Sequence, residues 1–373
     1  MPRVIRSVIR SFAVGKRRYI TLPFFHIGAH SRLSAAKSSF LLCVSAVKFL
    51  MNKIAIAIHG GAGTILSSQM TPDLEREYRG GLKAALNAGW EVLSKKGSSL
   101  DAVEAAVVSL EDFPLFNAGR GSVFTSEGKN EMDAAIMDGS SLRAGAVAFV
   151  TNVKHPVSLA RKVMEKTEHV LLAGEGANQF ASAIGAETET DEYFFTEHRW
   201  LQLQNAIAAG RVQLDHAEAV QGSKFKVQGH SENPHSKGTV GAVACDSNGD
   251  LAAATSTGGM TNKHFGRVGD TAMIGAGTYA DDTCAVSCTG HGEYFMLGVT
   301  AYDVAARMKY KGIGLEAAAR ETIERLTEIE GEGGIIAIDA FGNIVMPFNS
   351  EGMYRGSMTE KNGAQIGIYS SIE

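Results

Sequence analysis

The 373-residue sequence predicts a mixed α/β fold in which two β-sheets pack face to face under a cover of helices. Three observations support this class. Strand-like segments open the chain, helical patterns follow, and strands return in the second half. Apolar residues make up 45% of the chain, enough for a large core. Glycine accounts for 42 residues, above the typical share of roughly 7%. Because glycine permits sharp turns and close approach to a ligand, we expect a site built partly from main-chain groups.

The first elements are predicted from local patterns. Ile54–His59 is an apolar run of strand length followed by glycine, which is typical of a buried strand. A helix is expected to begin after Thr71, whose side chain can cap it, with Pro72 in the first helical position and its end at Gly97. Ser98 then opens a second helix with the pattern of a capping box.

Further elements follow from the same patterns. Strands are expected near 122–124, 131–137, 145–150, 170–172, 239–245, 251–257, 335–339 and 344–348. Helices are expected at 156–166, 200–209, 294–309 and 315–326. Between the two halves, the segment 211–237 is polar and aperiodic, and it predicts a flexible linker.

The first 50 residues differ in composition from the rest, with nine Lys and Arg and no Asp or Glu. Residues 51–373 hold 27 Lys and Arg against 40 Asp and Glu, an acidic balance that argues against a nucleic-acid partner. The apolar run 39–51 contains Lys48 and is shorter than a membrane span, so no membrane partner is expected. Residues 1–50 are either a basic leader, as a signal-peptide core or a transit peptide, or a non-native extension before a true start at Met51. The extension implies a cytoplasmic protein, and the leader implies export or organelle import.

The cysteines do not indicate a redox or metal site. Cys245, Cys284 and Cys288 have neither the spacing of a redox pair nor that of metal ligands. We expect them to be free buried thiols.

The most informative feature is the abrupt end of the linker at Gly238-Thr239, which opens a strand. A threonine at the start of a strand is usually structural, but here it is accompanied by a series of ordered motifs. These are His59-Gly60-Gly61-Ala62-Gly63, Phe116-Asn117-Ala118-Gly119, Met132-Asp133-Ala134, Gly238-Thr239-Val240-Gly241-Ala242-Val243-Ala244, Thr255-Ser256-Thr257-Gly258-Gly259-Met260-Thr261-Asn262-Lys263, Gly266-Arg267-Val268-Gly269-Asp270, Cys288-Thr289-Gly290-His291-Gly292-Glu293 and Phe348-Asn349-Ser350-Glu351-Gly352-Met353.

With these motifs, the chain resembles the plant-type asparaginase and isoaspartyl-peptidase family of N-terminal-nucleophile hydrolases, from about residue 53 to 370 apart from the linker. The resemblance implies a four-layer αββα sandwich. It also implies self-cleavage between Gly238 and Thr239 into an alpha subunit, 51–238 with the flexible linker 211–238, and a beta subunit, 239–373. Two such cleaved units are expected to form a dimer.

The chemistry of a threonine nucleophile fits this cleavage. A hydroxyl is a poor nucleophile until a base takes its proton. Cleavage would give Thr239 a free α-amine, whose ordinary pKa of about 7.7–8.0 suits a base near neutral pH. The resemblance implies that Thr257 orients this centre and that the Thr289 hydroxyl and the Gly290 N–H form an oxyanion hole. No cofactor is expected for catalysis.

The resemblance also assigns the substrate-binding residues. Arg267 can grip the α-carboxylate of an L-aspartyl group with two hydrogen bonds, and Asp270 can pair with its α-ammonium. Gly290 and Gly292 are expected beside the same group. Taken without the resemblance, Arg267 and Asp270 would be interpreted as a surface salt bridge.

The glycine-rich segment after the first strand is expected to support the site. Histidine is the commonest acid–base residue, but His59 ends a buried strand and an amine base is already available, so we expect a structural role beside the cleavage site. Gly60, Gly61 and Asn117 are expected to support the same region. The segment lacks the spacing of a phosphate or dinucleotide loop.

A structural sodium ion is implied by the resemblance alone. Its expected ligands are main-chain carbonyls, those of Leu110, Glu111, Phe113, Phe116, Ala118 and Arg120.

Three functions remain to be weighed. The favoured one is an isoaspartyl dipeptidase and L-asparaginase. The first alternative is glycosylasparaginase, a branch that typically has Asp-Thr where this chain has Gly238-Thr239. The second alternative is a catalytically inactive binding protein of the same fold. The sequence gives no preference between L-asparagine and β-aspartyl dipeptides.

Overall fold

The structure is a computed structural model that describes residues 54–63, 65, 70–210, 212 and 238–369. The leader or extension at 1–50 and nearly all of the linker at 211–237 lie outside the described residues. Within the described part, the strands form two sheets and helices pack against both of them. The predicted mixed α/β class is therefore confirmed. No helix of the described part is both long and apolar enough to cross a bilayer.

The larger sheet has eight strands in the described part of the chain, in the order β12-β11-β1-β5-β6-β2-β3-β4. All neighbouring pairs are antiparallel except β3 and β4. Its strands are β1 (Ala55–Gly63), β2 (Met132–Asp138), β3 (Arg143–Val150), β4 (Leu171–Ala173), β5 (Val240–Cys245), β6 (Leu251–Thr257), β11 (Gly352–Thr359) and β12 (Gly363–Gly367).

The smaller sheet is antiparallel, in the order β10-β9-β8-β7. Its strands are β7 (Thr278–Ala280), β8 (Cys284–Gly290), β9 (Gly333–Asp339) and β10 (Ile344–Val345). The helices are α3 (Pro72–Ser94), α4 (Ser99–Glu111), α5 (Pro156–Lys166), α6 (Gly174–Ala183), α7 (Asp191–Phe194), α8 (Glu197–Ala208), α9 (Gly292–Gly298), α10 (Thr300–Ala306) and α11 (Leu315–Glu328).

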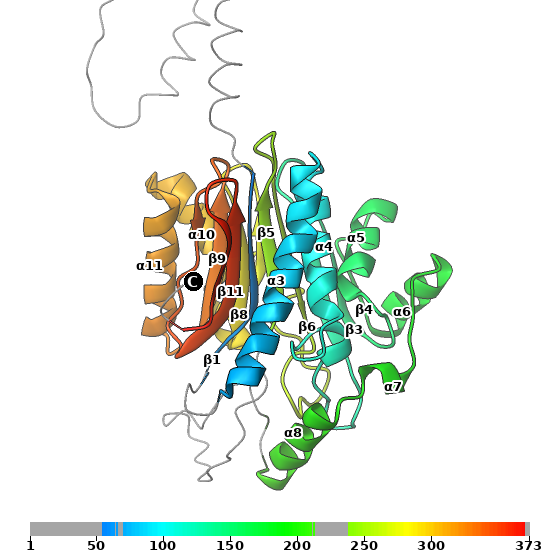
Figure 1. Ribbon diagram of the computed structural model, residues 1–373. Coiled ribbons are helices and arrows are strands. Elements are labelled where there is room, and N and C mark those ends of the chain that lie inside the picture. Colours follow the sequence, from blue (N-terminus) through cyan, green and yellow to red (C-terminus); the bar gives the residue numbers. More distant parts are fainter. Residues whose placement is uncertain (1–53, 64, 66–69, 211, 213–237, 370–373) are drawn as a thin grey trace, which may run out of the picture. The chain divides into compact units, whose positions relative to one another are not determined.

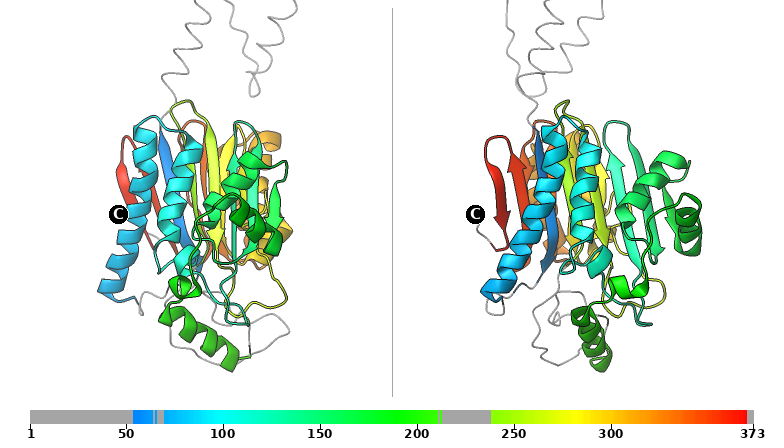
Figure 2. Two further views of the ribbon diagram at one scale, coloured as in Figure 1. Left: turned by 90° about the vertical axis from the view of Figure 1, so that its right-hand side faces the viewer. Right: turned by 45° about the vertical axis from the view of Figure 1, so that its right-hand side comes forward.

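The helices lie against the outer faces of the two sheets. Helices α3 and α4 run side by side across the larger sheet (Figures 1 and 2). Helices α10 and α11 lie beyond the smaller sheet (Figure 1). Buried apolar side chains fill the space between α3, α4 and the larger sheet, between the two sheets, and between the smaller sheet and α10 and α11.

Strand β1 explains how one strand serves two of these cores. It reads Ala55-Ile56-Ala57-Ile58, and successive side chains of a strand point to opposite faces. Ile56 and Ile58 pack toward the helices, and Ala55 and Ala57 face the smaller sheet. Each fully buried isoleucine contributes roughly 1.5–3 kcal/mol, while the alanines leave room for the second sheet to approach.

The structure confirms the helix starts and corrects several other expectations. Thr71 and Ser98 cap α3 and α4 through their side chains. The expected strand at 122–124 is instead a loop that follows a 3₁₀ turn at Gly119–Gly121. The expected helix at 294–309 is broken at Val299, whose φ of 48° is left-handed, and ends in a π-helical turn.

Other elements were missing from the sequence-based expectations. Strand β8 is buried on both faces and so lacks alternation. The remaining missed elements are α6, α7, β7, β11 and β12.

Candidate active site

Thr239 and Thr257 meet at one end of the larger sheet. Thr239 directly precedes β5, Thr257 ends β6, and the two strands pair with Val240 opposite Ser256. The Thr239 hydroxyl donates to Thr257 Oγ1 at 3.2 Å, and both side chains are buried. Thr257 Oγ1 also accepts from the N–H of Gly259 at 3.0 Å. The hydroxyl of Thr239 is therefore held by a partner that is itself fixed to the main chain.

His59 lies against the main chain of Thr239. Its Nδ1 is 2.9 Å from the Thr239 carbonyl oxygen, and its Nε2 is 2.8 Å from Ser287 Oγ. Burial lowers the pKa of His59 to about 3, and the hydrogen bond to Thr239 offsets this only in part. The imidazole is therefore neutral and fully buried, and both of its nitrogens have hydrogen-bond partners within the protein. This fits a structural role.

The glycines after His59 allow a close approach to the neighbouring loop. A β-bulge lies between His59 and Gly61, and Gly61 has a left-handed φ of 119°. A Cβ on Gly60 would lie 2.4 Å from the ring of Phe116. The turn therefore has no room for a side chain at Gly60, and Gly61 adopts a backbone conformation that favours glycine.

Thr289 belongs to the smaller sheet, but it lies at the same end of the two sheets as Thr239. His59 contacts Ser287, and three residues later the N–H of Ala62 donates to Thr289 Oγ1 at 3.2 Å. Strands β1 and β8 therefore run in the same direction here. Because β5 is antiparallel to β1, its start, which Thr239 precedes, lies beside the same end of β8. The buried Thr289 hydroxyl thus lies at the same end of the two sheets as Thr239.

Gly290 follows Thr289 at a tight crossing of β8 and β9. Its φ is 149°, and a Cβ there would lie 2.3 Å from the carbonyl oxygen of Glu332. Gly333, opposite it, is equally restricted, since its Cβ would lie 2.3 Å from the Thr289 carbonyl oxygen. Only glycine fits at these two facing positions of β8 and β9.

Arg267, Asp270 and Gly292 come together as one cluster. A Cβ on Gly292 would lie 2.7 Å from Asp270 Oδ1 and 2.9 Å from Arg267 Nη2. Asp270 is buried, and its Oδ2 has no hydrogen bond to any other described residue. Burial raises the pKa of Asp270 to about 7, against the opposing charge of Arg267. A buried carboxylate oxygen without a partner calls for a donor, and a ligand ammonium would supply one.

Glu293 is a member of this cluster that the sequence reasoning missed. Arg267 donates to both of its carboxylate oxygens, through Nε and Nη2, each at 2.9 Å. Glu293 directly follows Gly292, so its position within that motif was an available signal.

Asn117 links the loop that contains Gly259 to the loop that contains Val123. Its Nδ2 donates to the Gly259 carbonyl at 2.8 Å, and its Oδ1 accepts from the N–H of Val123 at 3.0 Å. The buried Lys263, which sequence reasoning did not single out, donates to the carbonyls of Gly258 at 3.0 Å and Glu131 at 2.8 Å. These bonds fix the turn whose Gly259 N–H binds Thr257.

The residues expected to hold sodium form a tight turn rich in carbonyl groups. A Cβ on Gly119 would lie 2.5 Å from the Glu111 carbonyl oxygen, and one on Gly121 would lie 2.1 Å from that of Phe116. The carbonyls of Leu110, Phe113, Phe116 and Ala118 accept main-chain hydrogen bonds. A carbonyl oxygen has a second lone pair, and oxygen donors suit hard cations. The turn thus brings together groups of the chemical type that would hold such an ion.

Two side chains tie this turn to the rest of the protein, and neither was expected from the sequence. Arg199 in α8 is fully buried and donates from Nε to the Gly121 carbonyl at 2.7 Å. The carboxylate of Glu111 accepts from Ser256 Oγ at 2.6 Å and from the N–H of Val157 at 3.0 Å. Burial raises the pKa of Glu111 to about 8.

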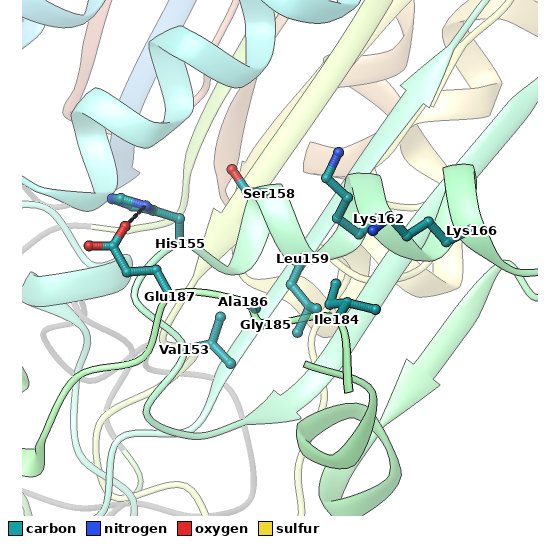
Figure 3. A pocket seen from close by; sticks show the side chains of 10 residues that line it. All are labelled: Val153, His155, Ser158, Leu159, Lys162, Lys166, Ile184, Gly185, Ala186 and Glu187. Atoms are coloured by element: carbon teal, nitrogen blue, oxygen red, sulfur yellow. Dashed lines mark ion pairs between the residues drawn. The ribbon is translucent and has the colours of Figure 1, made fainter. Parts of the chain in front are cut away.

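A surface pocket lies elsewhere on the protein. It is formed by α5 and the turn after α6, with His155 and Glu187 at one end and Lys162 and Lys166 at the other (Figure 3). None of the residues in the predicted site lines it. Within the described residues, no cluster of His, Cys, Asp or Glu side chains is arranged to hold a metal ion.

Comparison with known proteins places the chain in a family. The family described as asparaginase matches residues 52–368. The chain is 49% identical over 321 residues to the isoaspartyl peptidases of Salmonella typhimurium and Escherichia coli, covering 86% of this chain and 99% and 97% of theirs. It is 45% identical over 324 residues to the plant-type L-asparaginase of Pyrococcus abyssi, covering 84% of this chain and all of that one. The chain therefore belongs to the asparaginase family that includes the isoaspartyl peptidases and the plant-type L-asparaginases.

Proposed function

We propose that the protein is a self-cleaving threonine amidohydrolase that releases L-aspartate from β-aspartyl (isoaspartyl) dipeptides and from L-asparagine. The observation that carries the proposal is the hydrogen bond between Thr239 and Thr257 at the end of the larger sheet. The names of the relatives support the two substrates. In this proposal the fold is the four-layer αββα sandwich of N-terminal-nucleophile hydrolases, with subunits 51–238 and 239–373 and a dimer of cleaved units.

Self-cleavage begins when Thr239 Oγ1 attacks the carbonyl carbon of Gly238. The peptide nitrogen leaves with a proton, an ester joins Gly238 to Oγ1, and water hydrolyses the ester. The products are a carboxylate on Gly238 and a free amine and hydroxyl on Thr239. The φ of Gly238 is 64°, a left-handed conformation that costs most residues with a Cβ roughly 1–2 kcal/mol. That supports a glycine before the nucleophile.

Turnover then uses the new amine as the base. It takes the proton of Oγ1, which attacks the side-chain amide carbon of the aspartyl group, and the proton passes to the departing ammonia or amino acid. The Thr289 hydroxyl and the Gly290 N–H stabilise the oxyanion, each typically contributing about 10²–10³ in rate. Water hydrolyses the acyl ester and frees L-aspartate.

The aspartyl group is recognised by its two charges. Asp270 accepts the α-ammonium and Arg267 binds the α-carboxylate, and the absence of a side chain at Gly292 leaves room between them. The position of Asp270 Oδ1, 2.7 Å from where a Cβ at Gly292 would lie, supports this assignment. A sodium ion held by the carbonyls around Gly119 would stiffen the turn that carries Asn117, and it takes no part in the bond-breaking steps.

The alternatives are less well supported. The relatives compared above are named isoaspartyl peptidases or an L-asparaginase, which does not favour glycosylasparaginase. A catalytically inactive protein would not need the buried, hydrogen-bonded pair of Thr239 and Thr257.

Two measurements on the purified protein test the proposal. Intact-mass analysis should find a fragment that begins at Thr239. Assays for L-aspartate should detect release from L-asparagine and β-aspartyl dipeptides, with N4-(β-N-acetylglucosaminyl)-L-asparagine as the discriminating third substrate. A chain that stays whole, or that is cut only within 211–237, contradicts the mechanism. Turnover of the glycosylated substrate alone would select the alternative.

A further inference from the structure

A continuous line of hydrogen bonds leads from the smaller sheet to the main chain of Thr239. Thr278 Oγ1 is 2.7 Å from Thr255 Oγ1, which is 2.7 Å from Ser287 Oγ. Ser287 Oγ is 2.8 Å from His59 Nε2, and His59 Nδ1 is 2.9 Å from the Thr239 carbonyl oxygen. The four side chains before Thr239 are fully buried. Of these five residues only Thr239 takes part in the proposed bond-breaking steps.

The direction of every proton in this line is fixed by its last member. A carbonyl oxygen can only accept, so Nδ1 of His59 must carry the proton. The imidazole is neutral, because burial lowers its pKa to about 3. Its Nε2 is then an acceptor, and Ser287 must donate to it. Thr255 in turn donates to Ser287, and Thr278 to Thr255, because each of these two contacts is 2.7 Å long. The competing acceptors are farther away: the Gly277 carbonyl oxygen is 3.4 Å from Thr255 Oγ1, and that of Thr271 is 3.2 Å from Thr278 Oγ1.

The line crosses from one sheet to the other. Thr278 and Ser287 belong to β7 and β8 of the smaller sheet, while Thr255 and His59 belong to β6 and β1 of the larger one. A buried hydroxyl without a partner costs about 1–3 kcal/mol. Each of the two 2.7 Å hydroxyl contacts needs one donor, so together they favour one tautomer of His59 and one direction of donation along the line.

Gly241 makes room for the line. A Cβ at this position would lie 2.0 Å from Ser287 Oγ and 2.5 Å from His59 Nε2. The second glycine of Gly238-Thr239-Val240-Gly241 is therefore required by the contact between His59 and Ser287.

The carbonyl group that His59 binds belongs to Thr239, the proposed nucleophile. Thr239 lies outside the paired segment of β5, which begins at Val240. In the proposed function, cleavage would also remove its covalent tether to Gly238. The bond from His59 would then hold the main chain of the new N-terminal residue. Small displacements of a reacting group are costly, with roughly 10²-fold in rate for about 1 Å.

We propose that Ser287 and Thr255 are positioning residues that act through His59 to hold the carbonyl group, and with it the nucleophile, of Thr239 in place. The inference rests on the proposed role of Thr239 as nucleophile. It adds that the line of hydrogen-bonded hydroxyl groups, which includes residues of the smaller sheet, determines the position of that nucleophile.

The first test is independent of activity. Nitrogen-15 NMR of histidine-labelled Thr239→Ala protein, which keeps the carbonyl and is expected to remain a single chain, reports which ring nitrogen of His59 is protonated. His59→Asn identifies the signal. The expected result is a neutral ring with the proton on Nδ1, unchanged between about pH 5 and 8. A proton on Nε2 would overturn the inference without touching the proposed function.

The second test separates the two ring nitrogens. An asparagine at position 59 can place its amide nitrogen near the site of Nδ1 and keep the bond to Thr239, whereas a glutamine places it near Nε2. His59→Gln should lose at least about tenfold more kcat than His59→Asn, with KM within about twofold of the parent for both. Equal losses, or a larger loss in His59→Asn, would refute the anchoring role.

The third test breaks the line further away. Ser287→Ala and Thr255→Val should lower kcat by about 10- to 100-fold and slow self-cleavage, with KM within about twofold. Thr255→Ser keeps the hydroxyl and should recover most of the loss. Thr322→Val is the matched control. It removes a buried hydroxyl of α11 that donates to Asp303 of α10 at 3.1 Å, and neither residue belongs to the line. Loss of kcat in this control, or no recovery in Thr255→Ser, would reduce the effect to general destabilisation and overturn the inference.

Discussion

Arg267 and Glu293 form a two-pronged ion pair beside the candidate site, with Nε and Nη2 each 2.9 Å from a carboxylate oxygen. The Arg267 side chain is 17% exposed and that of Glu293 41%. The carboxylate of Glu293 is the more exposed partner of the pair, so water or another carboxylate can reach the position it occupies. The sequence analysis expected the Arg267 guanidinium to bind a substrate carboxylate. In the structure the Glu293 carboxylate already orients it.

Truncation of Arg267 should weaken both substrates alike. The α-carboxylate belongs to the aspartyl half, which L-asparagine and β-aspartyl dipeptides share. Loss of its charged partner costs roughly 2–5 kcal/mol, or about 30- to several-thousand-fold in kcat/KM. Steady-state kinetics of Arg267→Ala should show similar factors for both substrates, and the chain should still be cut before Thr239. A loss confined to dipeptides would place Arg267 on the leaving-group side.

A methyl group at Gly292 should act mainly on binding. Its Cβ would lie 2.7 Å from Asp270 Oδ1 and 2.9 Å from Arg267 Nη2, in the space assigned to the substrate. Gly292→Ala should raise KM by at least about tenfold for both substrates while self-cleavage proceeds. Gly176→Ala is the matched control, since its Cβ would meet nothing within 4 Å. An unchanged KM in Gly292→Ala would contradict the placement of the aspartyl group.

Replacement of Thr239 should separate cleavage from folding. Thr239→Ala removes the hydroxyl and should give one uncut, inactive chain on a denaturing gel. Thr239→Ser keeps a hydroxyl and should still be cut, although the missing methyl leaves its rotamer less restricted and should slow the reaction. Activity of the alanine variant equal to that of the parent would remove Thr239 from its assigned role.

Glu111 should make the folded protein less stable as pH rises. Burial raises its pKa from 4.5 to about 8, so between these values the folded state keeps a proton that the unfolded state has released, and stability falls with increasing pH. Glu111→Gln removes this effect and retains acceptors for Ser256 and Val157. In the uncut Thr239→Ala background, the variant's advantage in unfolding free energy should grow from near zero at about pH 5 to a few kcal/mol at about pH 8. Urea titrations at both pH values measure it, and a difference independent of pH would show that Glu111 titrates normally.

The sequence alone determined the local features of this protein. Thr71 and Ser98 start helices because a capping side chain acts on the residues just after it. The paired strands β5 and β6 were expected because apolar runs flank a short turn. The ordered motifs indicated the family and most of the residues that lie together at the candidate site. They could do so because tight main-chain turns require glycine and charged ligands require charged side chains, and both are visible in the sequence.

Only the tertiary structure decided which distant groups meet. His59 contacts Ser287, 228 residues away, and the orientation of Arg267 depends on Glu293. The break at Val299 was equally hidden from the sequence, since its left-handed φ is not favoured by its own residue type. Local propensities act over a few residues, whereas the packing of two sheets fixes which strands face each other. The direction of the hydrogen bonds that reach Thr239 is therefore a property of the folded protein, set by a single carbonyl oxygen that can only accept.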